Sequence, residues 1–416
     1  MIKKYIKKII GQNNINKIKA YKNYFVSILK RGKKIEKLSE NIDDIITIEN
    51  KKGHIFCGYF DINPDNPYNS EQIIAGEVSK KAVCGKDKLD ICLVNYKTNN
   101  IKKISSTNAW NWQMGSRIRW SNKKNIIIYN DYIEGEYCSI FYNIEEERII
   151  KKIPYALYDI SSDEKFGLSI NFDRLQRLRA GYGYSNKKDE TINENVPAND
   201  GLYKVDLENG KKDLLVSYKQ LSEILPESKK NQCYINHISI SPNDDKVMFF
   251  FIWQTNKKPG WKATLFIFDL NTNEIKCLEK DSQVSHYAWR DNENILITGI
   301  SKETTKAFYR IYNVINSTFK NIDENKLNKD GHPRFSRKFK GFYSDTYPNS
   351  RYKQQFFKYL NNKYVPLMEL YHDPRMFGEK RCDLHPHYFR NSEVIALDTT
   401  FEKNKRQILI VRLKNE

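Results

Sequence analysis

The chain has 416 residues, of which 13% are aromatic, and a formal net charge of +19. It contains no run of about 18 apolar residues, which excludes a membrane-spanning helix. No apolar stretch of the length found in secretory signals follows its first lysines. The seven cysteines form no CxxC pair, so neither a zinc site nor a disulfide framework is indicated, and a reducing compartment is expected.

The first 38 residues form a strongly basic stretch. They hold 12 Lys or Arg and one acid, Glu36, so 12 − 1 gives +11 of the total charge. Apolar residues recur there at helical spacing, at Ile18, Tyr21, Phe25 and Leu29. We therefore predict a short basic helical arm over residues 1–44. Its apolar face either contacts an anionic membrane peripherally through residues 1–38, or packs on the main domain or a partner. Because the charge excess lies mostly in this arm, a nucleic-acid interface is not expected.

From residue 45 onward, short strand-like runs alternate with turn residues at regular spacing. Four clear copies of one unit can be aligned, at 236–269, 285–312, 331–359 and 384–411. Three weaker copies begin near His54, Trp112 and Tyr158. A repeated unit of four strands in roughly 40–50 residues is typical of a propeller blade. The sequence thus predicts an all-β fold, a seven-bladed β-propeller over residues 45–416.

Two features complete the predicted ring. The run 45–48, Ile-Ile-Thr-Ile, is placed to pair with the last blade and close the ring, which removes exposed strand edges. The polar insert 173–200 is predicted to be a loop over one face. The innermost strands are expected to begin near residues 54, 112, 158, 237, 286, 332 and 385.

Five of the seven histidines occupy the start of the repeated unit: His237, His286, His332, His385 and His387. The first strand of a blade lines the central channel, so we expect these side chains to converge at one channel mouth. His385 and His387 lie two residues apart, hence on one strand face, and with His332 could bind one metal ion. Alternatively, each imidazole bonds to a neighbouring blade.

At this point the sequence resembles a known family. Gly-His-Pro at 331–333 and His-Pro-His at 385–387 resemble motifs of oligogalacturonate lyases, seven-bladed propellers that cleave uronate polymers by β-elimination. The resemblance, over roughly 230–416, implies a manganese ion held by three histidines and a glutamine, with another histidine as the base. It assigns His332, His385 and His387 to the metal, and His286 or His237 to the base. The family's glutamine has no counterpart just upstream of His385, where Asp383 could substitute.

Other segments resemble a second, mostly uncharacterised set of bacterial propellers that we associate with surface-polysaccharide gene clusters. These segments are 110–116, 171–175, 179–184 and 345–348. This resemblance implies a role in capsule or exopolysaccharide assembly, in which the propeller binds glycan or acts as a scaffold. Lyase activity does not follow from that relationship.

The insert and its surroundings supply further candidate residues. We expect Arg174 and Tyr182 to take part in catalysis. Substrate binding is expected of Arg117, Arg177, Arg179, Tyr184 and Arg381, because arginine forks bind carboxylates and tyrosine rings stack on sugars. The alternative is a solvated loop with salt bridges. Asp345 and Asp398 occupy equivalent positions in two blades and are either an acid–base pair or hydrogen-bond acceptors in the channel.

Taken together, the sequence predicts an enzyme acting on an acidic, uronate-containing glycan by β-elimination, with a divalent metal and a histidine base. The alternative is a non-catalytic glycan-binding or scaffold propeller in surface-polysaccharide biosynthesis. The expected location is cytoplasmic, with peripheral contact at the inner membrane face as an open alternative. The sequence does not specify the sugar, the linkage or the oligomeric state.

Overall fold

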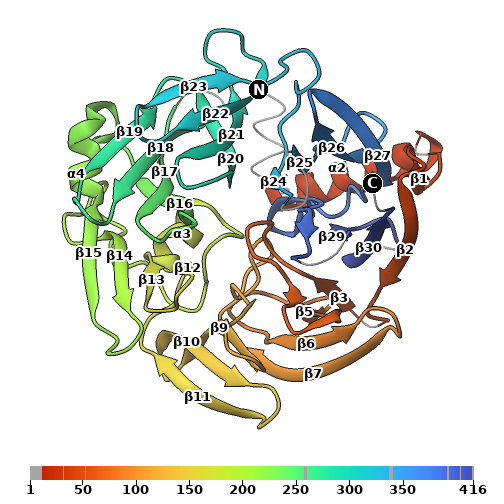
Figure 1. Ribbon diagram of the computed structural model, residues 1–416, viewed down its shortest axis with the longest axis horizontal. Helices are drawn as coiled ribbons and strands as arrows, with labels where there is room; N and C mark the ends of the chain where they lie inside the picture. Colours follow the sequence, from red (N-terminus) through yellow and green to blue (C-terminus); the bar gives the residue numbers. More distant parts are fainter. Residues whose placement is uncertain are drawn as a thin grey trace.

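The computed structural model describes residues 12–30, 32–51, 53–256, 260–336, 341–390, 393–402 and 404–414. Seven antiparallel sheets stand around one central axis (Figure 1). Apart from two N-terminal strands that join the outer edges of two sheets, the strands of each sheet follow one another in chain order from the centre outward. The prediction of a seven-bladed β-propeller is confirmed.

The first three blades come from the N-terminal half of the chain. Blade 1 contains β3 (Gly53–Phe56), β5 (Asn69–Ser79), β6 (Leu89–Asn95) and β7 (Asn100–Thr107), with the short β4 (Asp65–Asn66) paired to β5. Blade 2 contains β8 (Arg119–Trp120), β9 (Ile126–Ile133), β10 (Glu136–Asn143) and β11 (Arg148–Ile153). Blade 3 contains β12 (Asp159–Ile160), β13 (Phe166–Ser169), β14 (Gly201–Asp206) and β15 (Lys212–Ser217).

Blade 4 contains β16 (Cys233–Ile240), β17 (Lys246–Gln254), β18 (Trp261–Asp269) and β19 (Ile275–Glu279). Blade 5 contains β20 (Gln283–Trp289), β21 (Asn294–Ile300), β22 (Ala307–Asn313) and β23 (Thr318–Asn321). Blade 6 contains β24 (Arg334–Phe335), β25 (Gly341–Asp345), β26 (Lys353–Leu360) and β27 (Lys363–Tyr371). Blade 7 contains β28 (His387–Tyr388), β29 (Val394–Thr399) and β30 (Gln407–Leu413).

The inner strands begin within a few residues of the predicted positions in six blades. In blade 2 the predicted start, Trp112, is seven residues early, because 119 − 112 = 7. There the chain makes a tight turn closed by an Asn111–Gly115 bridge before β8 begins. Trp112 is nevertheless buried, against Phe56 and His54. Trp112 therefore belongs to the segment that leads into β8 and not to the strand itself.

The N-terminal segment closes the ring. β2 (Ile42–Ile48) pairs with β30 as the outer strand of blade 7, with Ile46 opposite Ile410. The predicted closure by 45–48 is therefore confirmed, and the strand starts three residues earlier. A second short strand, β1 (Ile35–Lys37), extends blade 6 by pairing with β27. These three residues were predicted to be helical.

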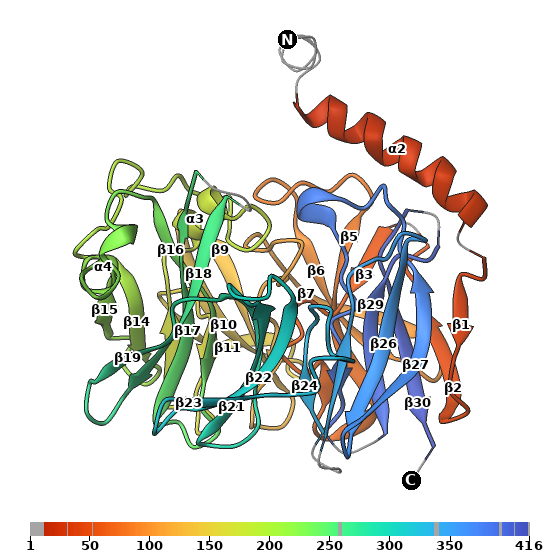
Figure 2. The same ribbon diagram turned by 90° about the horizontal axis from the view of Figure 1, so that it is seen from above.

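Ahead of β1 lies the helix α2 (Gln12–Lys30), which stands above one end of the propeller (Figure 2). It is attached to blade 6, because the Ser27 hydroxyl lies 2.6 Å from the Tyr371 hydroxyl and the Arg375 guanidinium lies 3.6 Å from the Tyr24 ring centroid. The remaining helices are short: α3 (Phe172–Leu178), α4 (Tyr218–Ile224), η1 (Pro226–Ser228) and η2 (Gly378–Lys380). Of the helices in the described ranges, none is long and apolar enough to cross a membrane.

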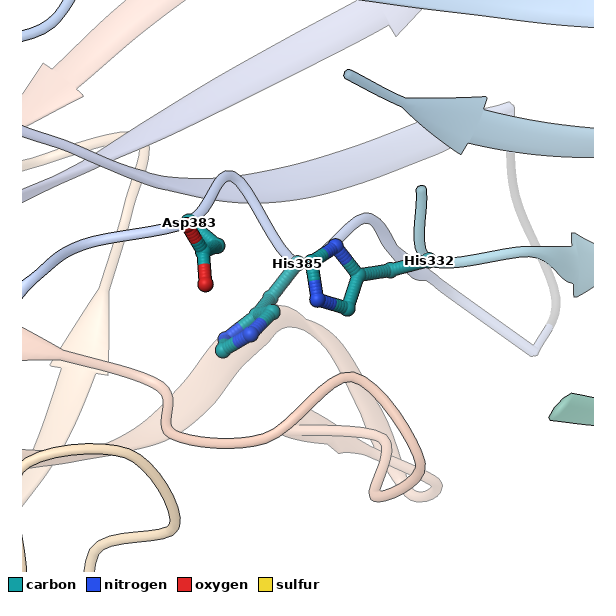
Figure 3. Close-up of side chains that lie close together, drawn as sticks. All are labelled: His332, Asp383 and His385. Atoms are coloured by element: carbon teal, nitrogen blue, oxygen red, sulfur yellow. The ribbon is translucent and has the colours of Figure 1, made fainter. Parts of the chain in front are cut away.

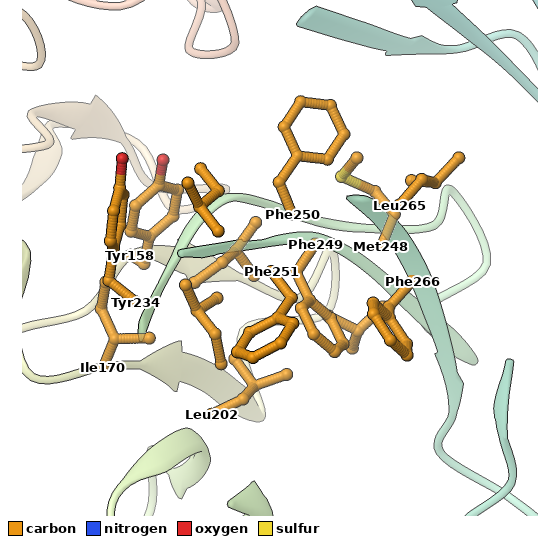
Figure 4. Packing of buried hydrophobic residues seen from close by; sticks show 14 of the residues in the cluster. Tyr158, Ile170, Leu202, Tyr234, Met248, Phe249, Phe250, Phe251, Leu265 and Phe266 are labelled. Carbon is orange, nitrogen blue, oxygen red and sulfur yellow. The ribbon is translucent and has the colours of Figure 1, made fainter. Parts of the chain in front are cut away.

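Aromatic and aliphatic side chains fill the space between neighbouring blades. The largest cluster surrounds β17, where Phe249 stacks on Phe266 of β18 at 5.6 Å while Phe251 meets the same ring edge-on (Figure 4). β17 is buried on both faces because blades 3 and 5 cover it. This explains why its sequence is an unbroken apolar run and not an alternating pattern.

The centre of the ring is filled by the segment 57–63, which we call the plug. It follows β3 and reaches toward the axis (Figure 1). Its Tyr59 and Phe60 are buried, and its Asp61 carboxylate pairs with Arg117 at 2.9 and 2.8 Å. The Asp398 carboxylate of β29 accepts hydrogen bonds from the backbone N–H groups of Cys57 and Gly58. The plug therefore supplies groups that the channel histidines contact, among them the Tyr59 hydroxyl and the Gly58 carbonyl oxygen.

Candidate functional site

The repeated histidines meet around this plug. Ring centroids are 5.8 Å apart for His237 and His286, 4.0 Å for His286 and His332, and 4.5 Å for His332 and His385. His237 and His385 adopt left-handed backbone conformations, with φ of 54° and 45°. Non-glycine residues rarely do so, and such outliers gather at functional sites. Four of the five predicted histidines, His237, His286, His332 and His385, thus lie side by side in the structure.

His332 is oriented by the carboxylate of Asp345. Its Nδ1 lies 2.8 and 3.0 Å from the two carboxylate oxygens, and its backbone N–H donates to Oδ1 at 2.7 Å. A carboxylate accepts hydrogen bonds, so Nδ1 carries the proton and Nε2 is the atom left for a ligand. Burial lowers the pKa of His332, but Asp345 outweighs burial and the net shift is upward.

His385 shows the same arrangement with a different acceptor. Its Nδ1 donates to the carbonyl oxygen of Gly58 in the plug at 2.9 Å. Its Nε2 is buried and has no hydrogen-bond partner among the described residues. Burial, together with the neighbouring His332, holds the pKa of His385 well below its ordinary value, so the imidazole is neutral. A buried, neutral imidazole nitrogen without a hydrogen-bond partner is suited to bind a metal ion.

Asp383 completes this group. Ligand atoms of His332, Asp383 and His385 lie within 4.8 Å of one another, and all three residues are buried (Figure 3). Burial alone would raise the pKa of Asp383, but the Arg381 guanidinium at 2.7 Å holds it well below the ordinary range. Two imidazole nitrogens and one ionised carboxylate are suitable ligands for a divalent transition metal. The donor set therefore fits the expected metal.

His387 does not belong to this group, contrary to the prediction. Its Nδ1 donates to the carbonyl oxygen of Ile62 at 2.9 Å, farther along the plug. Its Nε2 is buried without a partner, and burial lowers its pKa to about 4. The two-residue spacing was expected to align His385 with His387. His385, however, lies before β28 in a left-handed conformation, so the strand alternation does not extend to it.

His286 forms a second pair with a carboxylate. Its Nδ1 lies 3.2 Å from Oδ1 of Asp330, whose oxygens also accept hydrogen bonds from Ser285 and Thr298. Burial would raise the pKa of Asp330, but His286 and these hydroxyls lower it to about 2. Burial and the nearby His332 keep the pKa of His286 below its ordinary value. His286 is therefore neutral near pH 7, with its proton on Nδ1 and a lone pair on Nε2.

His237 is held differently. Its ring stacks on Tyr59 of the plug at 5.4 Å, and its Nδ1 lies 3.2 Å from the Tyr59 hydroxyl. Burial holds its pKa well below the ordinary value. A tyrosine hydroxyl both donates and accepts, so this contact does not fix which ring nitrogen carries the proton. Of the two predicted bases, His286 is the one oriented by a carboxylate.

A cavity of about 230 Å³ opens beside these rings. His237, His286 and Asp330 form one side of it. The other side includes Arg179, Tyr182, Trp261, Tyr347 and Arg381. It lies at the end of the propeller that carries α3, because Arg179 directly follows this helix (Figure 2).

Arg179 is the available cation of this cavity. Its guanidinium lies over the rings of Tyr182 at 5.3 Å and Trp261 at 5.4 Å. Within the described ranges its side chain makes no hydrogen bond or ion pair. Arg381, in contrast, is already paired with Asp383. An anionic ligand entering the cavity would therefore meet the uncommitted donors of Arg179.

Three other predicted arginines, Arg174, Arg117 and Arg177, bond to groups of the protein itself. Arg174 is fully buried and donates to the carbonyl oxygens of four residues, Cys233, Thr191, Glu194 and Asn195. The prediction that Arg174 takes part in catalysis is therefore corrected, because its donors bond to the insert and to β16 and not to the cavity. Arg117 is committed to Asp61 of the plug, and Arg177 bonds to Asp189 and Gln232.

The prediction that Tyr184 contacts substrate is also corrected. It is fully buried, stacks on Phe172 at 4.6 Å and accepts a hydrogen bond from Asn130. The first part of the insert is therefore packed, since α3 and the residues up to Tyr184 lie in the core, whereas residues 192–194 are exposed.

Sequence reasoning missed the plug and the orienting carboxylate of Asp330. Tyr59 and Phe60 lie in no repeat and carry no motif, so no pattern marked them. Asp330 stands two residues before His332, and Asp345 had been identified as a repeated blade position. The interpretation of Asp345 and Asp398 as channel hydrogen-bond acceptors is confirmed, since each binds backbone N–H groups.

No family profile matches the sequence, and neither does any curated protein sequence. Solved structures with the same fold do exist. An oligogalacturonate lyase in complex with manganese superposes with a TM-score of 0.66 at 10% identity, covering 91% of this chain and 95% of the other. An acylaminoacyl peptidase from Pyrococcus horikoshii gives 0.50 at 11% identity, covering 88% and 52%. At these identities the likeness shows the fold alone. The chain is thus a seven-bladed β-propeller that resembles oligogalacturonate lyase in its architecture.

Proposed function

We propose that this propeller is a lyase acting on a uronate-containing glycan by β-elimination. The observation that carries the proposal is that two kinds of histidine environment lie next to each other at one channel mouth. His332 and His385 each have Nδ1 bonded to an acceptor, and a ligand atom of each lies within 4.8 Å of the Asp383 carboxylate. His286 has Nδ1 fixed by Asp330 and lies next to His332. The first arrangement suits metal binding and the second suits proton transfer.

Each residue has a definite task in this reaction. Arg179 binds the substrate carboxylate through its free guanidinium donors. Asp330 keeps the proton of His286 on Nδ1, so Nε2 accepts the proton from C5 of the uronate. The electron pair of that C–H bond forms the C4–C5 double bond, and the C4–O bond breaks with its pair leaving on oxygen. The departing oxygen takes a proton from solvent, so the reaction is balanced.

A divalent metal held by His332, Asp383 and His385 would neutralise the carboxylate and so acidify the hydrogen on C5. Tyr182 and Tyr347 line the cavity around the site where the sugar would lie. The likeness to a manganese-bound oligogalacturonate lyase supports this reading of the donor set.

The test combines metal analysis with product detection. Purified protein should contain, or take up, one manganese or similar ion per chain. It should also release an unsaturated product, detected by its ultraviolet absorbance, from at least one member of a panel of uronate oligosaccharides. If an oligosaccharide binds but no such product forms, the non-catalytic glycan-binding function replaces this one.

A further inference from the structure

The outward face of α2 is apolar although α2 is firmly attached to the propeller. Ile18, Tyr21, Phe25 and Leu29 are 61%, 55%, 66% and 87% exposed. They recur at spacings of three and four residues and so form one stripe along the helix. The opposite face is buried on blade 6, through Ala20 and Ser27. The stripe therefore remains exposed when the helix is docked.

The attachment continues beyond the end of the helix. β1 pairs with β27, and Glu36 of β1 lies 2.6 Å from the ammonium of Lys353. The helix is thus held at both its C-terminal half and the strand that follows. An arm fixed in this way presents its stripe in a constant direction relative to the propeller.

The charges around the stripe indicate what covers it. α2 contains four lysines, Lys17, Lys19, Lys22 and Lys30, and no acidic residue. At about 100° per residue, Lys17 and Lys22 fall on either side of the stripe. This pattern, apolar in the centre and basic at the edges, is typical of helices that lie in the interface of an anionic bilayer. A second copy of the chain fits poorly, because two such helices would bring like charges together.

We propose that α2 is a membrane-docking helix that binds the propeller to a bilayer containing anionic lipid. The apolar stripe enters the headgroup region, and Lys17 and Lys22 contact lipid phosphates. Because α2 stands above the same end of the propeller as α3, the candidate site lies at the membrane-proximal end (Figure 2). This arrangement suits a polymer substrate carried at the membrane surface. Only this last step rests on the proposed lyase function.

The test is co-sedimentation of the full chain with vesicles. Phosphatidylcholine vesicles with about 30 mol % phosphatidylglycerol are compared with pure phosphatidylcholine, at low and high salt. We expect binding to the anionic vesicles only, weakened by salt. The double variant Phe25→Ser, Leu29→Ser should reduce the partition coefficient about tenfold or more, because both side chains would be buried in lipid.

Matched controls come from equally exposed apolar residues on the propeller. Ile149 and Ile315 are 50% and 52% exposed, and Ile149→Ser with Ile315→Ser should leave vesicle binding unchanged. Absence of binding by the parent chain, or equal binding by the α2 double variant, would overturn the proposal. So would a dimer in solution that the α2 variant dissociates, since the stripe would then serve a second copy. Lyase activity on a soluble substrate is not needed for any of these outcomes.

Discussion

The functional prediction rested on two groups of residues, the repeated histidines and the arginines of the insert, and only the histidines come together in the structure. The histidines of blades 4 to 7 come from segments about fifty residues apart, yet His237, His286, His332 and His385 form one chain of neighbouring rings. The arginines of the insert are close in sequence, yet they point apart. Of this group, Arg179 lines the cavity, while Arg174 and Arg177 bind the insert itself.

The physical reason is the difference between a repeated strand position and an irregular segment. Equivalent positions in a propeller are equidistant from the axis, so residues that share them must approach one another. An insert of nearly thirty residues has many backbone groups without strand partners, and buried carbonyl oxygens need donors. Arg174 supplies several donors from one side chain, which explains its burial. Repetition at long range is therefore a stronger signal of a site than a local cluster of charge.

The sharpest test of this comparison is the removal of a repeated histidine. His286→Ala should lower turnover by roughly 10²–10⁴-fold, because it removes the general base. Steady-state assays of the unsaturated product would measure this. As a control, His372→Ala removes a buried histidine that bonds to Thr400 outside the cavity. Equal loss of activity in both variants, at temperatures where both remain folded, would contradict the assignment.

A large effect is also expected from Asp398, which binds the plug. Burial raises the pKa of Asp398 from 3.8 to about 7. A group with a raised folded-state pKa stabilises the fold below its unfolded pKa, and this contribution is lost as the pH rises through the folded value. Between about pH 4 and pH 7 the loss should approach roughly 3–4 kcal/mol of unfolding free energy. Urea unfolding across this range would show it.

The variant Asp398→Asn provides the control for that measurement. Asparagine is neutral at every pH and keeps one acceptor oxygen for the N–H groups of Cys57 and Gly58. Its stability should therefore depend less on pH than that of the parent chain. Parallel pH profiles for the two proteins would show that Asp398 is ionised throughout the range.

The insert arginines give the next largest difference. Arg174→Met removes the donor of four carbonyl oxygens, of which that of Cys233 is in a buried bond, and should lower the unfolding free energy by about 3 kcal/mol. Arg179→Met should lower it by no more than about 1–2 kcal/mol, because among the described residues the Arg179 side chain makes only cation–π contacts, with Tyr182 and Trp261. In binding assays with a uronate oligosaccharide the order should reverse. A stable Arg174→Met protein with weakened binding would contradict this division.

The parts of the molecule that could be predicted from the sequence are those with a repeated pattern. The blades and their closure could be read because strand periodicity and turn residues are local, and β2 and β29 carry them plainly. The histidine mouth could be read from repetition. The plug could not, because Tyr59 and Phe60 owe their role to being surrounded by all the blades. Nor could the absence of His387 from the group formed by His332, Asp383 and His385, which depends on the left-handed turn at His385; Asp383 itself was proposed from the sequence in place of the family's glutamine.

The finest distinction concerns Asp345, which occupies the blade position equivalent to that of Asp398. Asp345 accepts the Nδ1 proton of His332 and the backbone N–H groups of both His332 and His385. In Asp345→Asn an amide donor replaces one of these oxygens, so His332 can shift its proton to Nε2, where the metal ligand is required. Manganese affinity should fall by about 10–100-fold, which is typical for loss of such a supporting group.

Isothermal titration with manganese would measure this change, and Asp398→Asn is the matched control. At pH 8, above the Asp398 pKa of about 7, both substitutions remove one buried carboxylate charge from equivalent ends of β25 and β29, but Asp398 bonds to the plug and not to a histidine. Affinity should therefore fall in the Asp345 variant and change little in the Asp398 variant. An equal loss in both would mean that the negative charge of the channel attracts the ion. Unchanged affinity in both would mean that Asp345 does not set the tautomer of His332, and that the histidines bind the ion without its support.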